Sequence, residues 1–153
     1  MENLLRVLQV AASGLSTQRM RLNVVANNIA NANTTRTEGE GAYRRRQVVV
    51  RAKEGTSLPR LFDVGIVGGE GMPESSLSGV EVARIVVDDR PGPRVYEPDH
   101  PDADEEGYVE YPNVDVVTEM TDMLSATRSY QANVTVIDAI KQTLLKALEI
   151  GRS

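Results

Sequence analysis

Residues 4–32 read LLRVLQVAASGLSTQRMRLNVVANNIANA, and this stretch decides the fold. Its apolar side chains recur at alternating spacings of three and four, the heptad spacing of a helix that packs along one line. The members of this line are Leu5, Leu8, Ala12, Leu15, Leu22, Ala26 and Ile29, with Arg19 as the one polar interruption. The pattern predicts an N-terminal assembly helix within residues 1–35.

The other end of the chain repeats this pattern over residues 116–148, VVTEMTDMLSATRSYQANVTVIDAIKQTLLKAL. Asn113 or Asp115 is expected to cap this helix, and Glu119 suits the positive end of the helix dipole. The apolar line comprises Val116, Met120, Met123, Thr127, Tyr130, Val134, Ile137, Leu144 and Leu148, with Lys141 as its interruption. We predict a C-terminal assembly helix within residues 113–153.

The middle of the chain, residues 36–112, differs in character because it holds every proline and most of the glycines. A Gly/Ser-rich stretch at 65–79 predicts a flexible loop. The β-like runs are Tyr43–Ala52, Val80–Asp88, Arg94–Glu97 and Tyr108–Tyr111. We therefore predict an α+β protein in which the terminal helices pair as a coiled coil and flank a small β-rich middle domain.

Composition excludes several classes of protein. The chain has 153 residues, a net charge of -5, no cysteine and a single histidine, so disulfides and multi-histidine metal sites are excluded. Acidity argues against a nucleic-acid partner. No run approaches the ~20 apolar residues of a membrane span, and the N-terminus lacks the pattern of a cleaved secretory signal.

Two long apolar lines on a small protein indicate assembly. A helix of ~30 residues is about 45 Å long, and the middle segment is too small to cover two of them. Part of the apolar surface would stay exposed in a monomer, which usually marks an interaction surface. We therefore expect a polymer or a partner-bound subunit.

An asparagine ladder lies on the first helix. Asn23, Asn27 and Asn31 are four residues apart, and Asn28 lies beside them. Because asparagine is a poor helix former, either these amides lie on a solvated face or they set register by hydrogen bonding across a helix–helix interface.

Charged runs leave alternatives open. The basic run Arg44–Arg46, with Arg51 and Lys53, is either a solvated strand face or a docking site for the acidic segment Asp99–Glu106. Nucleic-acid binding is the least favoured reading, since no aromatic platform accompanies the arginines. The acidic segment could attract Ca²⁺, but its spacing is not that of an EF-hand loop.

Catalytic motifs are absent from the sequence. The stretch at 68–71 (GGEG) lacks the lysine and hydroxyl residue of a phosphate-binding loop, and no Gly-x-Ser-x-Gly elbow occurs. Nothing in the sequence places a serine or aspartate beside His100. We therefore expect no enzyme, no cofactor and no metal.

Motifs at both ends resemble the flagellar rod and hook family. At the N-terminal end they are ASGL at 12–15, Gln18 with Arg21, ANNIANANT at 26–34 and GAYRR at 41–45. Those at the other end, which resemble the proximal rod proteins of that family, are PDAD at 101–104, GYV at 107–109, PNV at 112–114, EMTDM at 119–123 and ATRSYQAN at 126–133. The stretch at ~55–90 carries no matching motif.

The resemblance implies a structural subunit of the basal-body rod, which crosses the periplasm and transmits torque. It implies export through the flagellar type III apparatus without a cleaved signal, and helices that line the inner tube. Implied partners are further copies of the chain, other proximal and distal rod proteins, the membrane-ring adaptor and the export apparatus, with no nucleic acid and no membrane insertion. The alternative is a soluble coiled-coil adaptor that binds a partner helix outside the flagellum.

We expect the subunit contacts to involve side chains from both helices and from the start of the middle domain. These are Leu15, Leu22, Asn23, Asn27, Asn28, Ile29, Asn31 and Tyr43 towards one end, and Met120, Met123, Arg128, Tyr130, Asn133 and Ile137 towards the other. None is expected to be catalytic.

Overall fold

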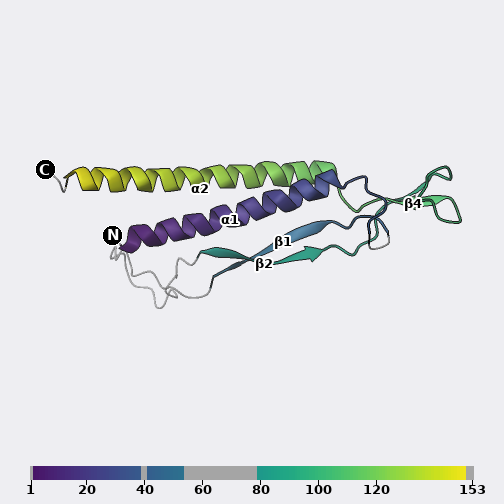
Figure 1. Ribbon diagram of the computed structural model, residues 1–153, viewed down its shortest axis with the longest axis horizontal. Coiled ribbons are helices and arrows are strands. Elements are labelled where there is room, and N and C mark those ends of the chain that lie inside the picture. The colour runs from purple at the N-terminus through teal and green to yellow at the C-terminus, as the bar shows by residue number, and fades with distance from the viewer. Residues whose placement is uncertain (1, 39–40, 54–78, 151–153) are drawn as a thin grey trace, which may run out of the picture.

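The fold is α+β, as predicted, with one long helix at each end of the chain (Figure 1). The computed structural model describes residues 2–38, 41–53 and 79–150, so the loop predicted at 65–79 lies outside the described residues apart from Gly79. The elements are α1 (Glu2–Ala30), β1 (Arg46–Ala52), β2 (Val80–Val87), β3 (Arg94–Tyr96), β4 (Tyr108–Glu110) and α2 (Val116–Ile150).

The two helices lie side by side and run antiparallel (Figure 1). Gly14 lies against Asn133, while Asn28 bonds to Glu119, so the contacts are two heptads apart on both helices. This register places Leu145 opposite the first described residue of α1. The last turn of α2 therefore extends beyond α1, as Figure 1 shows.

Asp115 caps α2, which settles the choice between the two predicted caps. Its Oδ1 accepts hydrogen bonds from the backbone N–H of Val117 and Thr118 at 2.9 and 3.3 Å, and thereby satisfies donors that the first helical turn leaves free. The hydrogen bond from the Thr118 hydroxyl is the largest cause that lowers the pKa of Asp115. Asn113 instead accepts from the backbone N–H of Arg45 at 2.8 Å, and so holds the chain that enters β1.

Strands β1 and β2 form an antiparallel hairpin that lies beside α1 (Figure 1). The register shifts between Val49 and Val50, which leaves Ala83 without a paired residue. Such a bulge reverses the alternation of side chains along one strand. It explains why the aliphatic residues of one face of β2 change from even positions, Val80 and Val82, to odd positions, Ile85 and Val87. Because paired residues share a face, the bulge gathers aliphatic side chains on one face, namely Val48, Val50, Val80, Val82, Ile85 and Val87.

The hairpin contacts α1 through polar groups at the edges of its strands. The Asn28 side chain bonds to both the backbone N–H and the C=O of Arg46, and the Ser13 hydroxyl accepts from the N–H of Val80 at 3.0 Å. Gly79 approaches Ser13 so closely that a Cβ there would lie 2.5 Å from the hydroxyl oxygen. Side chains on both faces of the hairpin stay exposed, among them Val49, Val50 and Ile85.

Strands β3 and β4 form a second, separate hairpin that projects beyond the helix pair (Figure 1). We call residues 94–110 the arm. Its connecting segment is held by Asp104, whose Oδ1 accepts from the N–H of Glu106 and Tyr108 at 3.0 and 2.8 Å. Gly107 has a φ of +82°, a backbone conformation that favours glycine. At the base of the arm Val109 is buried.

Candidate assembly interface and the polar cluster that organises it

A buried polar cluster joins both helices and the start of β1. Its centre is Asn28, whose side chain is wholly buried. The amide nitrogen donates to the Arg46 carbonyl at 2.8 Å and to Glu119 Oε2 at 2.9 Å. The amide oxygen accepts from the Tyr43 hydroxyl at 2.9 Å and the Arg46 N–H at 3.0 Å. All four hydrogen-bonding positions of this amide are therefore used.

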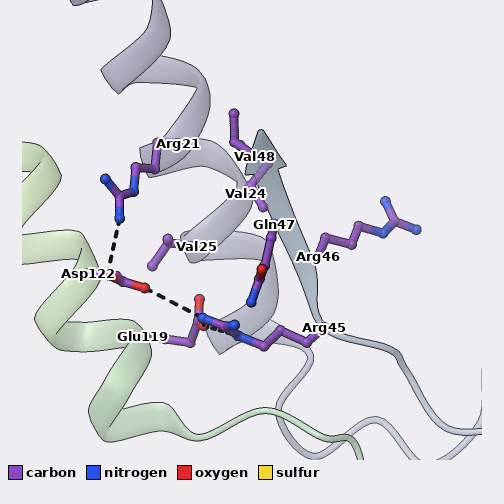
Figure 2. Close-up of a pocket in the computed structure, with 9 residues that line it drawn as sticks. All are labelled: Arg21, Val24, Val25, Arg45, Arg46, Gln47, Val48, Glu119 and Asp122. Carbon is purple, nitrogen blue, oxygen red and sulfur yellow. Dashed lines mark hydrogen bonds and ion pairs between the residues drawn. The ribbon is translucent and has the colours of Figure 1, made fainter. Parts of the chain in front are cut away.

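The second buried group is the Glu119 carboxylate, which is 0% exposed. Arg45 approaches its Oε1 with Nε and Nη2, each at 2.6 Å, and Asn28 binds the other oxygen. Arg45 also reaches Asp122 at 3.5 Å, and Asp122 in turn pairs with Arg21 of α1 at 3.3 Å. Figure 2 shows these ion pairs between α2, α1 and the segment that precedes β1.

Tyr43 completes the cluster as a neutral donor. Burial raises the pKa of its phenol, the nearby Arg46 guanidinium lowers it, and Glu119 raises it again. The hydroxyl therefore keeps its proton at neutral pH and continues to donate to Asn28. The Arg46 guanidinium lies 5.7 Å from the centre of the Tyr43 ring, within range of a cation–π contact.

A small open cleft of about 280 Å³ lies beside this cluster (Figure 2). Its lining is mostly charged or polar and consists of Arg21, Val24, Val25, Arg45, Arg46, Gln47, Val48, Glu119 and Asp122. The charged members that face one another already form ion pairs, so the arrangement fixes the relative positions of three chain segments. Within the described ranges, no three histidine or acidic side chains are grouped to hold a metal ion.

The helices do not pack along the large aliphatic residues that the heptad pattern selects. Gly14, Arg21 and Asn28, one heptad apart, contact α2, and Ala11 and Val25 are buried. This contact line is the predicted line of α1 displaced by one residue. Small and polar side chains thus form the contact, and the larger aliphatic side chains flank it.

Apolar side chains on both helices are consequently left open. Val117, Met120 and Leu124 lie on one face of the first turns of α2, at helical spacings of three and four. They are 73%, 56% and 61% exposed. Leu5 of α1 and Leu148 at the far end of α2 are exposed as well. Exposed apolar positions at helical spacing are typical of a surface that another chain covers.

The residues predicted as subunit contacts fall into three groups. Exposed are Asn23, Asn27, Met120 and Arg128; half-buried are Leu15, Leu22, Ile29, Asn31, Met123, Tyr130, Asn133 and Ile137; buried are Asn28 and Tyr43. The hydrogen bond from Asn28 to Glu119 crosses the helix pair, as one of the two interpretations of the asparagine ladder predicts. Asn27 and Asn31 bond to backbone carbonyls one turn earlier in α1.

Within one subunit, Arg44 and Arg45 of the basic run do not dock on the acidic segment at 99–106, which corrects that hypothesis for contacts inside the chain. Arg44 pairs with Glu110 at 3.0 Å, and Arg45 pairs with Glu119 and Asp122. In the acidic segment, Asp102 instead accepts from the Thr35 hydroxyl at 2.7 Å. The run serves to attach β1 to the second helix and to the arm.

Sequence reasoning missed the charged half of the cluster. Glu119 and Asp122 are three residues apart and share one face of α2. Two carboxylates on the contact side of a helix, in a chain with an arginine run, were the available signal. From its place in the helix, Glu119 is interpreted through the helix dipole, and it also belongs to the family motif at 119–123.

The antiparallel terminal helices, their polar cluster and the uncovered apolar side chains are typical of a subunit that assembles through its helices, and the family models place it among axial flagellar proteins. Two family models match, described as "Flagella basal body rod protein" over residues 8–36 and "Flagellar basal body rod FlgEFG protein C-terminal" over residues 105–150. None of the helices in the described part of the chain is long and apolar enough to cross a bilayer.

Similarity to curated proteins extends over almost the whole chain. The flagellar basal-body rod protein FlgC of Bacillus subtilis is 45% identical, with 95% of this chain and 96% of the relative covered. That of Borreliella burgdorferi is 42% identical with 94% of both covered, and that of Escherichia coli is 41% identical with 97% and 98% covered. This chain belongs to the FlgC family of flagellar basal-body rod proteins.

Proposed function

We propose that this chain is a structural, non-catalytic subunit of the proximal rod of the bacterial flagellar basal body. The observation that carries the proposal is near-full-length similarity to proteins named as basal-body rod protein FlgC. The exposed apolar side chains of the helix pair support it, because a subunit that is never covered would expose Val117 and Leu124 to water permanently. The adaptor alternative has no support among the relatives.

The proposed mechanism is mechanical. Copies of the chain and other rod proteins pack their helix pairs together, and torque passes through these contacts. The buried cluster suits this role, since Arg45 and Glu119 tie β1 to α2 and Asn28 ties α1 to both. A torque applied to one helix is then carried by the whole subunit.

Further partners belong to the proposal. We expect contacts with copies of itself, with other proximal and distal rod proteins and with the adaptor between membrane ring and rod. Export is proposed to proceed through the type III apparatus. Exposed predicted residues such as Asn23, Asn27 and Arg128 are the candidates for specificity, because their side chains are open to solvent on the two helices.

Replacement of the chromosomal copy tests the proposal. Cells without the chain are expected to lack rods and hooks and to be non-motile. The variant Val117→Asp with Leu124→Asp should fold, because both positions are exposed, yet should fail to enter basal bodies. A matched variant at exposed polar positions, Gln131→Asp with Thr135→Asp, should swim normally.

The proposal is wrong if cells that lack the chain build normal hooks. It is also wrong in its choice of surface if the Val117/Leu124 variant assembles as well as the matched variant. Immunoblotting of purified basal bodies and of whole cells separates failure to assemble from failure to accumulate.

A further inference from the structure

The β1–β2 hairpin presents an uncovered surface whose composition is aliphatic and basic. Val49 and Val86 lie on one face together with Arg51 and Arg84, and are 37% and 36% exposed. A two-stranded hairpin is marginally stable alone and usually needs cover on an apolar face. The half-buried valines Val48, Val80 and Val82 belong to the other face, and Val48 lines the cleft beside α1. Within the described residues the face that carries Val49 and Val86 remains open.

The charge of this hairpin is unbalanced. Residues 46–53 and 80–87 hold four cations, Arg46, Arg51, Lys53 and Arg84, against one carboxylate, Glu81. Arg51 pairs with Glu81 at 2.6 Å. The other three cations form no ion pair with the rest of the described chain. Arginine and lysine side chains are long enough to border a neighbouring aliphatic patch.

The arm has the complementary composition. Its residues 94–110 hold seven carboxylates against one arginine. Three of these carboxylates, on Asp99, Glu105 and Glu106, are exposed and have no cationic partner in the part of the chain described. The rings of Tyr96 and Tyr108 meet edge to face with centroids 5.3 Å apart, and Tyr96 is 61% exposed.

The arm is also held in one shape before any partner binds. Thr35 and Arg36 tie Asp102 to the chain that follows α1. Glu97 N–H donates to the Gly107 carbonyl at 2.9 Å, and Asp104 binds the connecting segment from within. A preorganised loop loses little conformational entropy on docking, and exposed tyrosines are frequent at the energetic centres of interfaces.

We propose that the arm of one copy docks on the β1–β2 hairpin of a second copy of this chain. Tyr96 and Tyr108 cover Val49 and Val86, while the free carboxylates of the arm meet the free cations Arg84, on the same face, and Lys53, at the end of β1. An apolar centre with a charged rim of opposite sign is the usual anatomy of a specific interface. The two surfaces are different, so the contact is head-to-tail and leaves a free arm and a free hairpin at the two ends of any open chain of subunits.

This inference rests on the proposed function, because only a subunit that assembles meets other copies of itself. It assigns a contact outside the helix pair. Paired surfaces of this kind set the direction in which copies add, because each copy accepts an arm on one side and offers one on the other.

Charge reversal on the purified full chain tests the inference. The arm variant is Glu105→Lys with Glu106→Lys, and the hairpin variant is Lys53→Glu with Arg84→Glu. The matched control reverses Asp138 and Glu149, two exposed acids of α2, to lysine. Sedimentation velocity over a range of concentrations, at about 50 mM and about 500 mM NaCl, measures self-association and its screening by salt.

The unmodified chain and the control are expected to form open-ended oligomers that weaken at the higher salt. Each reversed variant should dissociate with a constant raised more than tenfold. A mixture of the two variants should associate again, because the arm variant keeps an intact hairpin and the hairpin variant keeps an intact arm, and the two reversed surfaces are themselves opposite in charge.

Three results would overturn the inference: an unmodified chain that stays monomeric at millimolar concentration, reversed variants that associate like the control, or a mixture that remains monomeric. Circular dichroism establishes that each variant is folded. If the reversed variants lose self-association but enter rods normally, the arm contact is refuted as a contact of the rod and the proposed function stands. Association in solution by a chain that is absent from rods refutes only the proposed function.

Discussion

Removal of the Arg45 guanidinium is expected to be the most destabilising single change in this subunit outside its small apolar core. We consider Arg45→Met, which keeps most of the apolar stem and leaves the carboxylate of Glu119 without its cation. Glu119 is 0% exposed and Arg45 retains 16% of its side-chain exposure, so water cannot replace the lost partner.

The magnitude follows from the geometry. Opposite charges about 4 Å apart attract by about 4 kcal/mol at an effective dielectric constant near 20. Measured losses on removal of one member of a buried pair are ~3–5 kcal/mol. Since small domains are stable by about 5–15 kcal/mol, Arg45→Met should remove a third or more of the stability.

An exposed pair provides the matched control. Arg90 pairs with Asp88 at 2.5 Å, close to the 2.6 Å between Arg45 and Glu119, but its side chain is 80% exposed. Arg90→Met should therefore cost no more than ~1 kcal/mol. Adding Glu119→Gln to Arg45→Met removes the stranded charge, keeps an acceptor for Asn28, and should restore about 2 kcal/mol.

Urea unfolding followed by circular dichroism at 222 nm measures all four proteins. The reasoning is refuted if Arg45→Met and Arg90→Met lie within 1 kcal/mol of each other, or if Glu119→Gln deepens the loss.

Three further predictions concern other contacts of the same fold. Tyr43→Phe removes a buried donor to Asn28 and should cost about 1 kcal/mol in urea unfolding; an unchanged midpoint would show that the hydroxyl contributes nothing. Gly14→Ala should stabilise α1 by up to ~1 kcal/mol, but only when Asn133→Ala is also present. In the unmodified chain the new Cβ would lie 2.9 Å from the Asn133 amide nitrogen. Equal effects of Gly14→Ala on the urea midpoint with and without Asn133→Ala would argue against the close approach. Hydrogen bonds from its arginine partner lower the pKa of Asp88 to about 2 from 3.8, so the stability it contributes is complete above pH 3.8 and is lost as the pH falls towards 2. Urea midpoints should fall less over that range in Asp88→Asn, and parallel pH profiles would contradict the assignment.

Much of the fold could be predicted because periodicity reports which elements form. Both terminal helices, all four strands and the family are confirmed, with strand ends displaced by at most a few residues. Asp115 was one of two predicted caps, and the alternative, Asn113, proved to bond the chain near β1 instead. Local chemistry is enough for predictions of this kind, because capping and alternation depend on neighbours in the chain.

The line of contact between the helices could not be predicted in the same way. The heptad rule selects large aliphatic residues such as Leu15 and Leu22, whereas the helices meet at Gly14, Arg21 and Asn28. A glycine allows close approach and a buried amide sets register, but both need a partner whose position is unknown from sequence. The role predicted for Leu15 and Leu22, contact with other subunits, stays a prediction that the uncovered surface favours.

The polar cluster was hard to predict because its members are far apart in the chain. Arg45 and Glu119 are 74 residues apart, and an arginine run has several acidic candidates. The expected acidic partner at 99–106 is engaged by Thr35, Arg36 and Arg94 instead. Long-range pairing of charges follows from the chain path, which periodicity does not report.

Cysteine accessibility tests the central claim most directly, because the chain contains no cysteine of its own. Leu124→Cys places a thiol on the open surface of α2, and Ala126→Cys places one at a position that is 0% exposed. In the purified monomer a maleimide should label residue 124 and spare residue 126. In purified basal bodies both should be protected, since neighbouring subunits cover α2. Equal labelling of residue 124 in the monomer and in basal bodies would contradict the claim that assembly covers this helix.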